Sequence, residues 1–298
     1  MSGAGNKGPE VSETWRQRWT LRGQDVFARA VIGLLRALPY GRRVGLGGWI
    51  LRRIVGPLAG YDRRIAKNLA LIWPDLPPTE VKHITQGVCD NLGRTLAELY
   101  SPAEFKARAA ASPVRGNLEA VLEAQARGQG VILISGHFGN HDIARAMLDG
   151  RGHPVAALYR PQSNAEFDRH FSATIRAISE PLFGRERREL AGLVTHLKKG
   201  GMLGVLIDQY YHLGEKLDFL GRPAKTSTAM ASMALKYDLL LVPVYGIRQP
   251  DGVSFELVVE EPIPHSDPVT MTQAVNDSLA AMVRAHPEQW LWAHRRWR

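Results

Sequence analysis

The stretch GVILIS at residues 130–135, followed at once by GHFGNHD at residues 136–142, decides the fold class that we predict for this chain. A short, largely apolar run bounded by glycine is typical of a strand that is buried on both faces of a sheet. In a parallel sheet, ligands bind in the loops at the carboxyl ends of the strands. We therefore expect residues 136–142 to border a ligand site.

Further strands and helices are predicted to alternate from about residue 113 to the C-terminus. The segment at 239–245 is the weakest of these strands, because Pro243 cannot donate a hydrogen bond to a neighbour. Near-continuous apolar strands separated by helices predict an α/β fold with a mostly parallel central sheet flanked by helices. The other expected strands are 155–159, 202–207 and 253–259, and the expected helices are 118–125, 143–148, 165–178, 190–199, 230–236 and 270–285.

The chain before this region is predicted to be helical. Residues 1–13 are rich in Gly, Ser and Pro and are expected to be a disordered tail. Residues 14–112 are expected to form a helical N-terminal layer, which makes one structural domain with the α/β region at 113–298. Within the layer, a helix over 81–100 is predicted to begin with Thr79 as its N-cap and Glu80 in its first turn.

Positive charge is concentrated in that layer. The formal net charge is +9, and the window 14–67 contains twelve Arg or Lys against only Asp25 and Asp62. Arginines interrupt the apolar runs, so no segment reaches the roughly 18–20 apolar residues that span a bilayer. The layer could be a soluble helical hairpin covered by arginine stems. It could instead be an interfacial membrane anchor, with Trp15, Trp19 and Trp49 at headgroup level.

The loop at 136–142 carries the candidate chemistry. His137 and Asp142 are separated by four residues, so the carboxylate could fold back onto one imidazole nitrogen and leave the other to accept a hydroxyl proton. Asn140 could cap the helix that follows, which would place Asp142 near its N-terminus. Such a pair often arises by chance, so its spacing alone does not establish catalysis.

The same residues admit other interpretations. His137, His141 and Asp142 could bind a metal ion, but no recognisable metal-site spacing completes the set. The loop also lacks the dinucleotide fingerprint, and the chain has neither a nucleophile elbow nor a phosphate-binding loop. Cys89 is the only cysteine, which fits a reducing compartment, and it is interpreted as a core residue of its helix.

GHFGNHD resembles the His-x4-Asp/Glu motif of glycerolipid-type acyltransferases. Other segments, in order along about residues 60–298, resemble one branch of them, the bacterial lipid A biosynthesis (lauroyl/myristoyl) acyltransferase family. The matching segments are KNL at 67–69 with IWPDL at 72–76, NLGR at 91–94 with Glu98, YRP at 159–161 with Asn164, LKKG at 197–200 with DQ at 208–209, FLG at 219–221 with PA at 223–224, and PEQWLWAHRR at 287–296.

The resemblance implies roles for individual residues. His137 is implied as the base that deprotonates the acceptor hydroxyl, and Asp142 as the carboxylate that orients it. Arg160 is implied as a contact to the substrate or transition state. Asp208 could be a second carboxylate near His137, and Gln209 could donate an amide hydrogen bond there. Asn140 joins this substrate-contacting group, and purely structural roles stay open for Arg160, Asp208 and Gln209.

The chain departs from the family pattern at two points. Tyr210 and Tyr211 follow Asp208-Gln209 where the family often has a third acid, and the motif has Asn-His-Asp where some lipid A enzymes have Thr-Leu-Glu. The second departure leaves the acceptor open. The C-terminal cluster could form core and rim of the fold or could meet lipid headgroups; it comprises Trp290, Trp292, His294, Arg295, Arg296 and Trp297.

The expected function is transfer of a fatty acyl group from acyl carrier protein or CoA to a hydroxyl of a lipid A precursor or related glycolipid. No cofactor, metal or nucleic-acid partner is expected. An anionic membrane surface is expected as a partner, and the protein is expected to attach as a peripheral or monotopic protein to the cytoplasmic face of an inner membrane. The alternatives are acylation of another lipid, such as a lysophospholipid or amino-acid lipid, and a non-catalytic basic lipid-binding protein.

Overall fold

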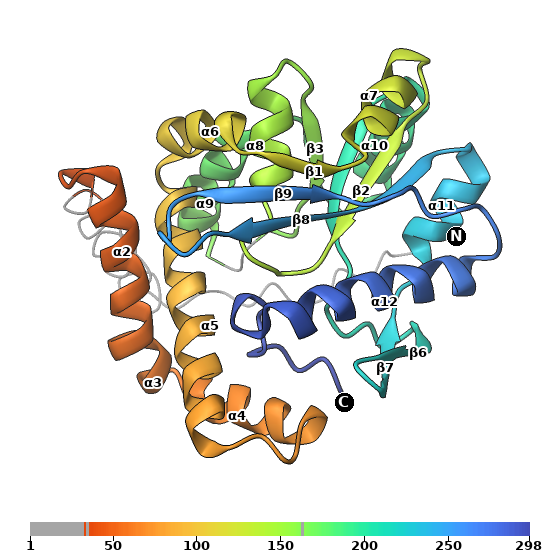
Figure 1. Ribbon diagram of the computed structural model, residues 1–298. Helices are drawn as coiled ribbons and strands as arrows, with labels where there is room; N and C mark the ends of the chain where they lie inside the picture. Colours follow the sequence, from red (N-terminus) through yellow and green to blue (C-terminus); the bar gives the residue numbers. More distant parts are fainter. Residues whose placement is uncertain (1–32, 34–35, 162–163) are drawn as a thin grey trace, which may run out of the picture.

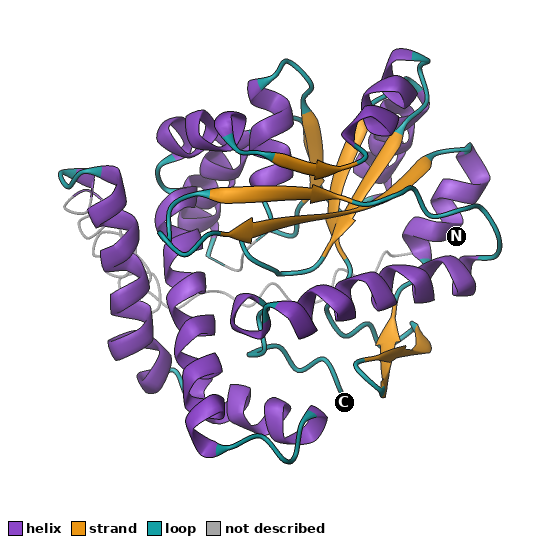
Figure 2. Cartoon of the chain, viewed as in Figure 1, coloured by secondary structure: helices purple, strands orange, loops and turns teal. Residues whose placement is uncertain are grey.

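A seven-stranded sheet forms the centre of the molecule (Figures 1 and 2). The computed structural model describes residue 33, residues 36–161 and residues 164–298. The strand order is β1-β9-β8-β2-β5-β3-β4, and every neighbouring pair is parallel except β8 and β9. The predicted mostly parallel α/β fold is confirmed. The strands are β1 Val114–Gly116, β2 Val131–Ser135, β3 Val155–Leu158, β4 Leu182–Phe183, β5 Met202–Leu206, β8 Leu240–Arg248 and β9 Phe255–Val259.

Helices cover both faces of the sheet, as the apolar strands require. In β2, Val131 and Leu133 face one hydrophobic cluster, whereas Ile132 and Ile134 face another. Alternate residues of a strand point to opposite faces, so both faces of β2 are buried. The first cluster contains residues of α6 Pro102–Ala111, α7 Leu118–Ala126 and α8 Ile143–Gly150, and the second those of α10 Arg187–Lys198, α11 Ala229–Tyr237 and α12 Pro268–Ala285. The helix α9 Ala165–Ile178 matches its predicted bounds.

The strand predicted at 239–245 exists and is longer than expected. Pro243 pairs with Ile134 at the last register position between β8 and β2, and the pairing of β8 with β9 begins at Val244. Its carbonyl accepts a hydrogen bond from the Glu260 amide (3.0 Å). Pro243 therefore lies where β8 leaves one neighbour for the other, and its missing N–H does not interrupt a continuous ladder.

The described part of the N-terminal layer is helical. It comprises α2 Tyr40–Ile50, a π-helical turn Leu51–Val55, α3 Gly56–Leu58, α4 Tyr61–Ile72 and α5 Pro78–Leu99. The prediction of Thr79 as N-cap is wrong. The N-cap is Pro77, two residues earlier, because proline at position 78 is well suited to the first helical position; Glu80 lies in the first turn as expected. No described helix is both long and apolar enough to cross a membrane. The predicted tail at 1–13, Trp15 and Trp19 lie outside the described residues.

A small hairpin beside the C-terminal segment was not predicted from the sequence. Strands β6 Glu215–Phe219 and β7 Arg222–Thr226 are antiparallel, and Leu220 and Gly221 between them both have positive φ. Two such residues form the tight turn that suits the twist of a hairpin. Phe219 at its end packs against Trp290, with ring centroids 5.3 Å apart. The hairpin thus supports the C-terminal aromatic residues.

Candidate active site

Two adjacent strand ends bring His137 and Asp208 together. β2 and β5 are parallel neighbours, and Ser135 pairs with Leu206 at their carboxyl ends. His137 and Asp208 follow these positions by two residues each. One Asp208 oxygen lies 2.8 Å from His137 Nδ1, and the other accepts the His137 backbone N–H at 2.8 Å. The Trp290 indole N–H also donates to that second oxygen (2.9 Å). The carboxylate is therefore fixed by three bonds, and Nε2 is the ring nitrogen left for chemistry.

The expectation that Asp142 folds back onto the imidazole is wrong. Asp142 is the N-cap residue of α8, and its Oδ1 binds Arg145 Nη1 at 2.6 Å. The chain turns directly into the helix at Ile143, so Arg145 lies one turn on and within reach of the carboxylate. The other oxygen of Asp142 is 3.9 Å from His141 Nε2. Asp142 acts on His137 through its charge and forms no hydrogen bond with the ring.

The electrostatics of the pair favour an ionised Asp208 and a basic His137. Burial by itself lowers the pKa of His137, but the charge and hydrogen bond of Asp208, helped by Asp142, raise that pKa above its ordinary value. Burial likewise raises the pKa of Asp208, yet His137 holds that pKa well below its usual range. For Asp142, burial is opposed mainly by Arg145, and the pKa of this carboxyl is also lowered. Both carboxylates are thus charged at neutral pH.

The loop around His137 has a tightly constrained backbone. Gly139 has a φ of 52°, and a Cβ there would meet the carbonyl oxygen of Gly246 at 1.8 Å. A Cβ on Gly136 would lie 2.7 Å from Leu279 and 3.1 Å from Asp208. The two glycines are what allow the loop to pass so close to its neighbours.

The C-terminal segment pairs with this loop. The Leu291 amide donates to the His137 carbonyl (3.0 Å), the Gly139 amide donates to the Gln289 carbonyl (2.9 Å), and Phe138 and Trp290 form an antiparallel bridge. The segment PEQWLW therefore fixes both the backbone of the base and, through Trp290, the position of Asp208.

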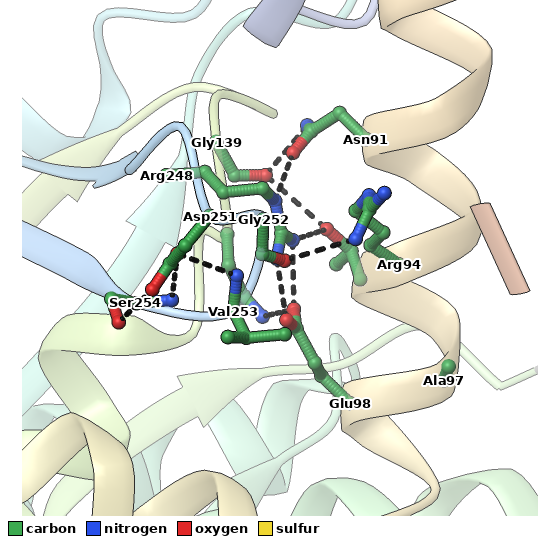
Figure 3. Close-up of polar contacts among 12 residues, drawn as sticks. Asn91, Arg94, Ala97, Glu98, Gly139, Arg248, Asp251, Gly252, Val253 and Ser254 are labelled. Atoms are coloured by element: carbon green, nitrogen blue, oxygen red, sulfur yellow. Dashed lines mark hydrogen bonds and ion pairs between the residues drawn. The ribbon is translucent and has the colours of Figure 1, made fainter. Parts of the chain in front are cut away.

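Behind the loop lies a buried ion pair (Figure 3). Arg248 on β8 binds both oxygens of the fully buried Glu98 on α5, at 2.5 and 2.8 Å. Figure 3 shows Arg248 between the helix that carries Asn91 and Glu98 and the loop at Gly139; the Asn91 side chain donates to the Gly139 carbonyl at 2.9 Å. A buried pair with all its hydrogen bonds satisfied fixes a geometry strongly, since either partner alone would be an unpaired buried charge.

Asn140 belongs to this supporting network. Its side chain donates to Glu98 (2.7 Å) and accepts from the Asp142 amide (2.9 Å), and only 1% of its surface is exposed. The prediction that Asn140 caps α8 is wrong, because Asp142 is the N-cap residue. The Asn140 side chain does accept a hydrogen bond from the Asp142 amide. Its place behind the loop gives no support to a direct substrate contact.

A cavity of about 630 Å³ opens beside His137. The predicted residues Asp142, Arg160 and Gln209 line it together with His137, whereas Asp208 lies behind His137, only 1% exposed. Most of the other lining residues are apolar: Leu133, Ala144, Ala157, Leu158, Pro161, Phe171, Ile175, Leu182, Val205, Leu206 and Val244. The arrangement is a base at the edge of a cavity with apolar walls, into which Asp142, Arg145, Arg160, Arg185 and Gln209 also bring charged or polar groups.

Sequence reasoning missed several residues of the site. Arg185 lines the cavity, as does His141, which the sequence had indicated only as a possible metal ligand, and the His294 ring lies tilted against His137 with ring centroids 4.7 Å apart. Glu98 lies in a segment that resembles the family and Trp290 in the C-terminal cluster, but the contacts of Glu98 with Arg248 and of Trp290 with Asp208 were not predicted. Trp290, Trp292 and Arg296 are buried, which answers the C-terminal question in favour of the core for these three. Cys89 is buried, as predicted.

No group of three or more His, Cys, Asp or Glu side chains suited to a metal ion occurs in the part of the chain that the structure describes.

Comparison with known proteins identifies the family. The match to bacterial lipid A biosynthesis acyltransferases spans residues 13–298. The lipid A biosynthesis lauroyltransferase of Escherichia coli (strain K12) is 25% identical over 276 residues, which cover 90% of this chain and 89% of that protein. A phosphatidylinositol mannoside acyltransferase of Mycobacterium tuberculosis (strain CDC 1551 / Oshkosh) is 25% identical over 246 residues, covering 80% and 78%. The chain belongs to the bacterial lipid A biosynthesis acyltransferase family and is an O-acyltransferase.

Proposed function

We propose that this acyltransferase moves a fatty acyl group from a thioester to a hydroxyl of a lipid A precursor or related glycolipid, with His137 as general base. The observation that carries the proposal is the His137–Asp208 pair at the edge of an apolar cavity of about 630 Å³. A carboxylate on Nδ1 fixes the tautomer in which Nε2 accepts a proton, and it stabilises the imidazolium that results.

The reaction follows from this geometry. Nε2 of His137 takes the proton from the acceptor hydroxyl while the hydroxyl oxygen attacks the thioester carbonyl carbon, and a new C–O bond forms. The tetrahedral intermediate then collapses, the C–S bond breaks, and the imidazolium returns its proton to the departing thiolate. Asp208 stays ionised throughout, because its pKa is far below neutral.

The remaining cavity residues serve the acyl donor. The apolar walls accept a fatty chain, since burying each CH₂ contributes about 0.8 kcal/mol. Arg160 and Gln209 line the same cavity and can donate hydrogen bonds to the oxyanion that develops on the thioester carbonyl. Asp142 is assigned to positioning Arg145 and to raising the pKa of His137 from a distance.

The identities of donor and acceptor rest on charge and on the relatives. A basic chain suits an acidic acyl carrier protein, and CoA is the alternative thioester. The names of the relatives include both lipid A and phosphatidylinositol mannoside enzymes, which supports a glycolipid acceptor; another lipid acceptor is the second candidate. A non-catalytic lipid-binding role has no support from a site whose base and carboxylate are held this closely.

We further propose that α2 and α3 contact the membrane surface. Trp49, Ile54, Val55 and Leu58 are exposed there, and Leu58 is 85% exposed. Arg42 and Arg53 on the same segment are also exposed, which suits anionic headgroups. Leu58→Ser should weaken binding to vesicles that contain phosphatidylglycerol, whereas Leu190→Ser on α10 should not. Equal binding by both variants would contradict this surface.

The proposal is tested by mass spectrometry of membrane lipids from cells with and without the gene, followed by transfer assays with acyl carrier protein and CoA thioesters. We expect one glycolipid to lose a single acyl chain when the gene is deleted, and the purified protein to restore it. An unchanged lipid profile together with no transfer to the glycolipid would contradict the function.

A further inference from the structure

Four basic side chains surround two adjoining cavities on the other side of His294. Arg64 and Lys67 come from α4, and Arg295 and Arg298 come from the C-terminal segment. The cavities measure about 650 and 560 Å³ and share Arg64, Arg295 and Arg298. We call Arg64, Lys67, Arg295 and Arg298 the basic cluster.

The basic cluster has no acidic partner in the described chain. None of its four side chains forms an ion pair there with a carboxylate. Asp62, the nearest acid along α4, instead contacts the Cys89 thiol at 3.9 Å. Arg64 donates to the Ala59 carbonyl (3.0 Å), and Arg298 lies over the Tyr210 ring. Like charges that line a concave surface without compensation focus a positive potential, and that potential favours an anionic ligand.

The cluster is held in place by the fold. Asn68, on α4 beside Lys67, donates to the carbonyls of Trp292 (2.6 Å) and His294 (2.8 Å). In Figure 1 the C-terminal segment runs down toward α4, in agreement with these bonds. Arg295 is therefore positioned against Lys67 by hydrogen bonds between the two elements that carry them.

The basic cluster is also close to the catalytic base. His294 lines both basic cavities and its ring contacts that of His137, and Gln209 lines both the apolar cavity and the larger basic one. Burial and the charge of His137 lower the pKa of His294 to about 4, so His294 is neutral at neutral pH. A ligand bound in the basic cavities would thus reach His137 from the side of His294.

We propose that the basic cluster binds a phosphate group on the headgroup of the acceptor lipid and so presents the acceptor hydroxyl to His137; this inference rests on the proposed function. Guanidinium and ammonium groups suit phosphate oxygens, which accept strong charge-assisted hydrogen bonds. The exposed apolar residues of α3 immediately precede α4, so the cluster lies next to the surface that we assign to the membrane, where lipid phosphates are found. The thioester donor also carries phosphate, but its chain is assigned to the apolar cavity.

The test uses Lys67→Gln/Arg295→Gln, which removes two charges from the cluster without touching the Arg64 hydrogen bond. Its matched control is Arg63→Gln/Lys82→Gln, which removes two exposed charges from α4 and α5 outside the cavities. Initial rates are measured with a phosphorylated lipid A precursor and with its enzymatically dephosphorylated counterpart, first at varied acceptor concentration and then at varied donor concentration. The cluster variant should raise KM for the phosphorylated acceptor by about tenfold, while the control should not.

Two results would overturn the proposal: an unchanged preference for the phosphorylated acceptor in the cluster variant, or a raised KM for the donor alone. A second measurement separates this failure from that of the proposed function. Titration of the phosphorylated precursor, in detergent micelles, into inactive His137→Ala protein should show binding that the two cluster substitutions weaken about tenfold. If the wild-type protein shows no turnover in any assay but this binding is intact, the proposed function is contradicted and the phosphate subsite is retained. If the cluster and control variants bind the precursor equally, the phosphate subsite is refuted.

Discussion

Replacing Asp208 with Asn tests the assignment of the carboxylate partner. Asn keeps the size of the side chain and can still accept the Trp290 indole N–H, but it removes the negative charge from His137 Nδ1. Both the rate and its dependence on pH should change, because the charge acts on the imidazolium of the transition state and also on the free base.

The magnitude follows from the geometry. Asp208 is 1% and His137 21% exposed, so solvent screens their interaction only partly. Two unit charges about 4 Å apart interact by about 4 kcal/mol at an effective dielectric constant near 20, which corresponds to about a 10³-fold loss of kcat. Since Asp208 raises the pKa of His137, the acid limb of the pH–rate profile should also move to lower pH in the variant.

The assay is the initial rate of acyl transfer across a range of pH, with circular dichroism to establish that each variant is folded. Asp277→Asn, an exposed carboxyl on α12, is the matched control. Asp142→Asn is the informative comparison: it should shift the acid limb less than Asp208→Asn, because Arg145 already neutralises Asp142. A folded Asp208→Asn enzyme with kcat within tenfold of wild type and an unmoved acid limb would refute the reasoning.

The same contacts predict three further effects. The His137–Asp208 pair should add most to the free energy of unfolding between about pH 4 and 6.5, because its contribution is present above the ordinary pKa of Asp and is lost as pH rises through the raised pKa of His137. Urea unfolding of wild type and Asp208→Asn across this pH range checks this prediction, and a difference in free energy of unfolding that does not change with pH would contradict it. Ala157→Phe should fill part of the apolar cavity and shift the preferred donor to shorter acyl chains, and the affinity for a donor should fall about tenfold for each two CH₂ groups that no longer fit. Rates with a series of acyl thioesters check this prediction, and an unchanged order of preference would show that the acyl chain binds elsewhere. Gly139→Ala should lower both the melting temperature and the rate, because its Cβ would overlap the Gly246 carbonyl, whereas Gly152→Ala, also at positive φ but in open space, should lower the melting temperature less.

The sequence predicted five of the seven strands of the sheet because their signal is local, whereas the short edge strands β1 and β4 were missed. The apolar runs of β2, β3 and β5 and their flanking glycines identify the strands, and the loop after β2 could be assigned to a ligand site by a general rule of parallel sheets. The hairpin of β6 and β7 was missed because its alternating charged residues, such as those of EKLDF, carry little hydrophobic signal.

The site was predicted less completely because its partners are distant in sequence. His137 was identified within its loop, and Asp208 was suggested as a second carboxylate, yet only the pairing of β2 with β5 shows that the two meet. Trp290 is 82 residues from the carboxylate that it binds, and no local pattern predicts such a contact. Asp142 was assigned to His137 because it is near in sequence, whereas the first turn of α8 directs it to Arg145.

The function of His137 as general base is tested most directly by the rate of acyl transfer of purified His137→Ala protein, compared with His83→Ala, an exposed histidine on α5. Both variants should be folded and should bind vesicles as wild type does. We expect kcat of His137→Ala to fall by about 10²- to 10⁴-fold while His83→Ala keeps the wild-type rate. A folded His137→Ala protein that transfers acyl groups within tenfold of the wild-type rate would contradict the assignment.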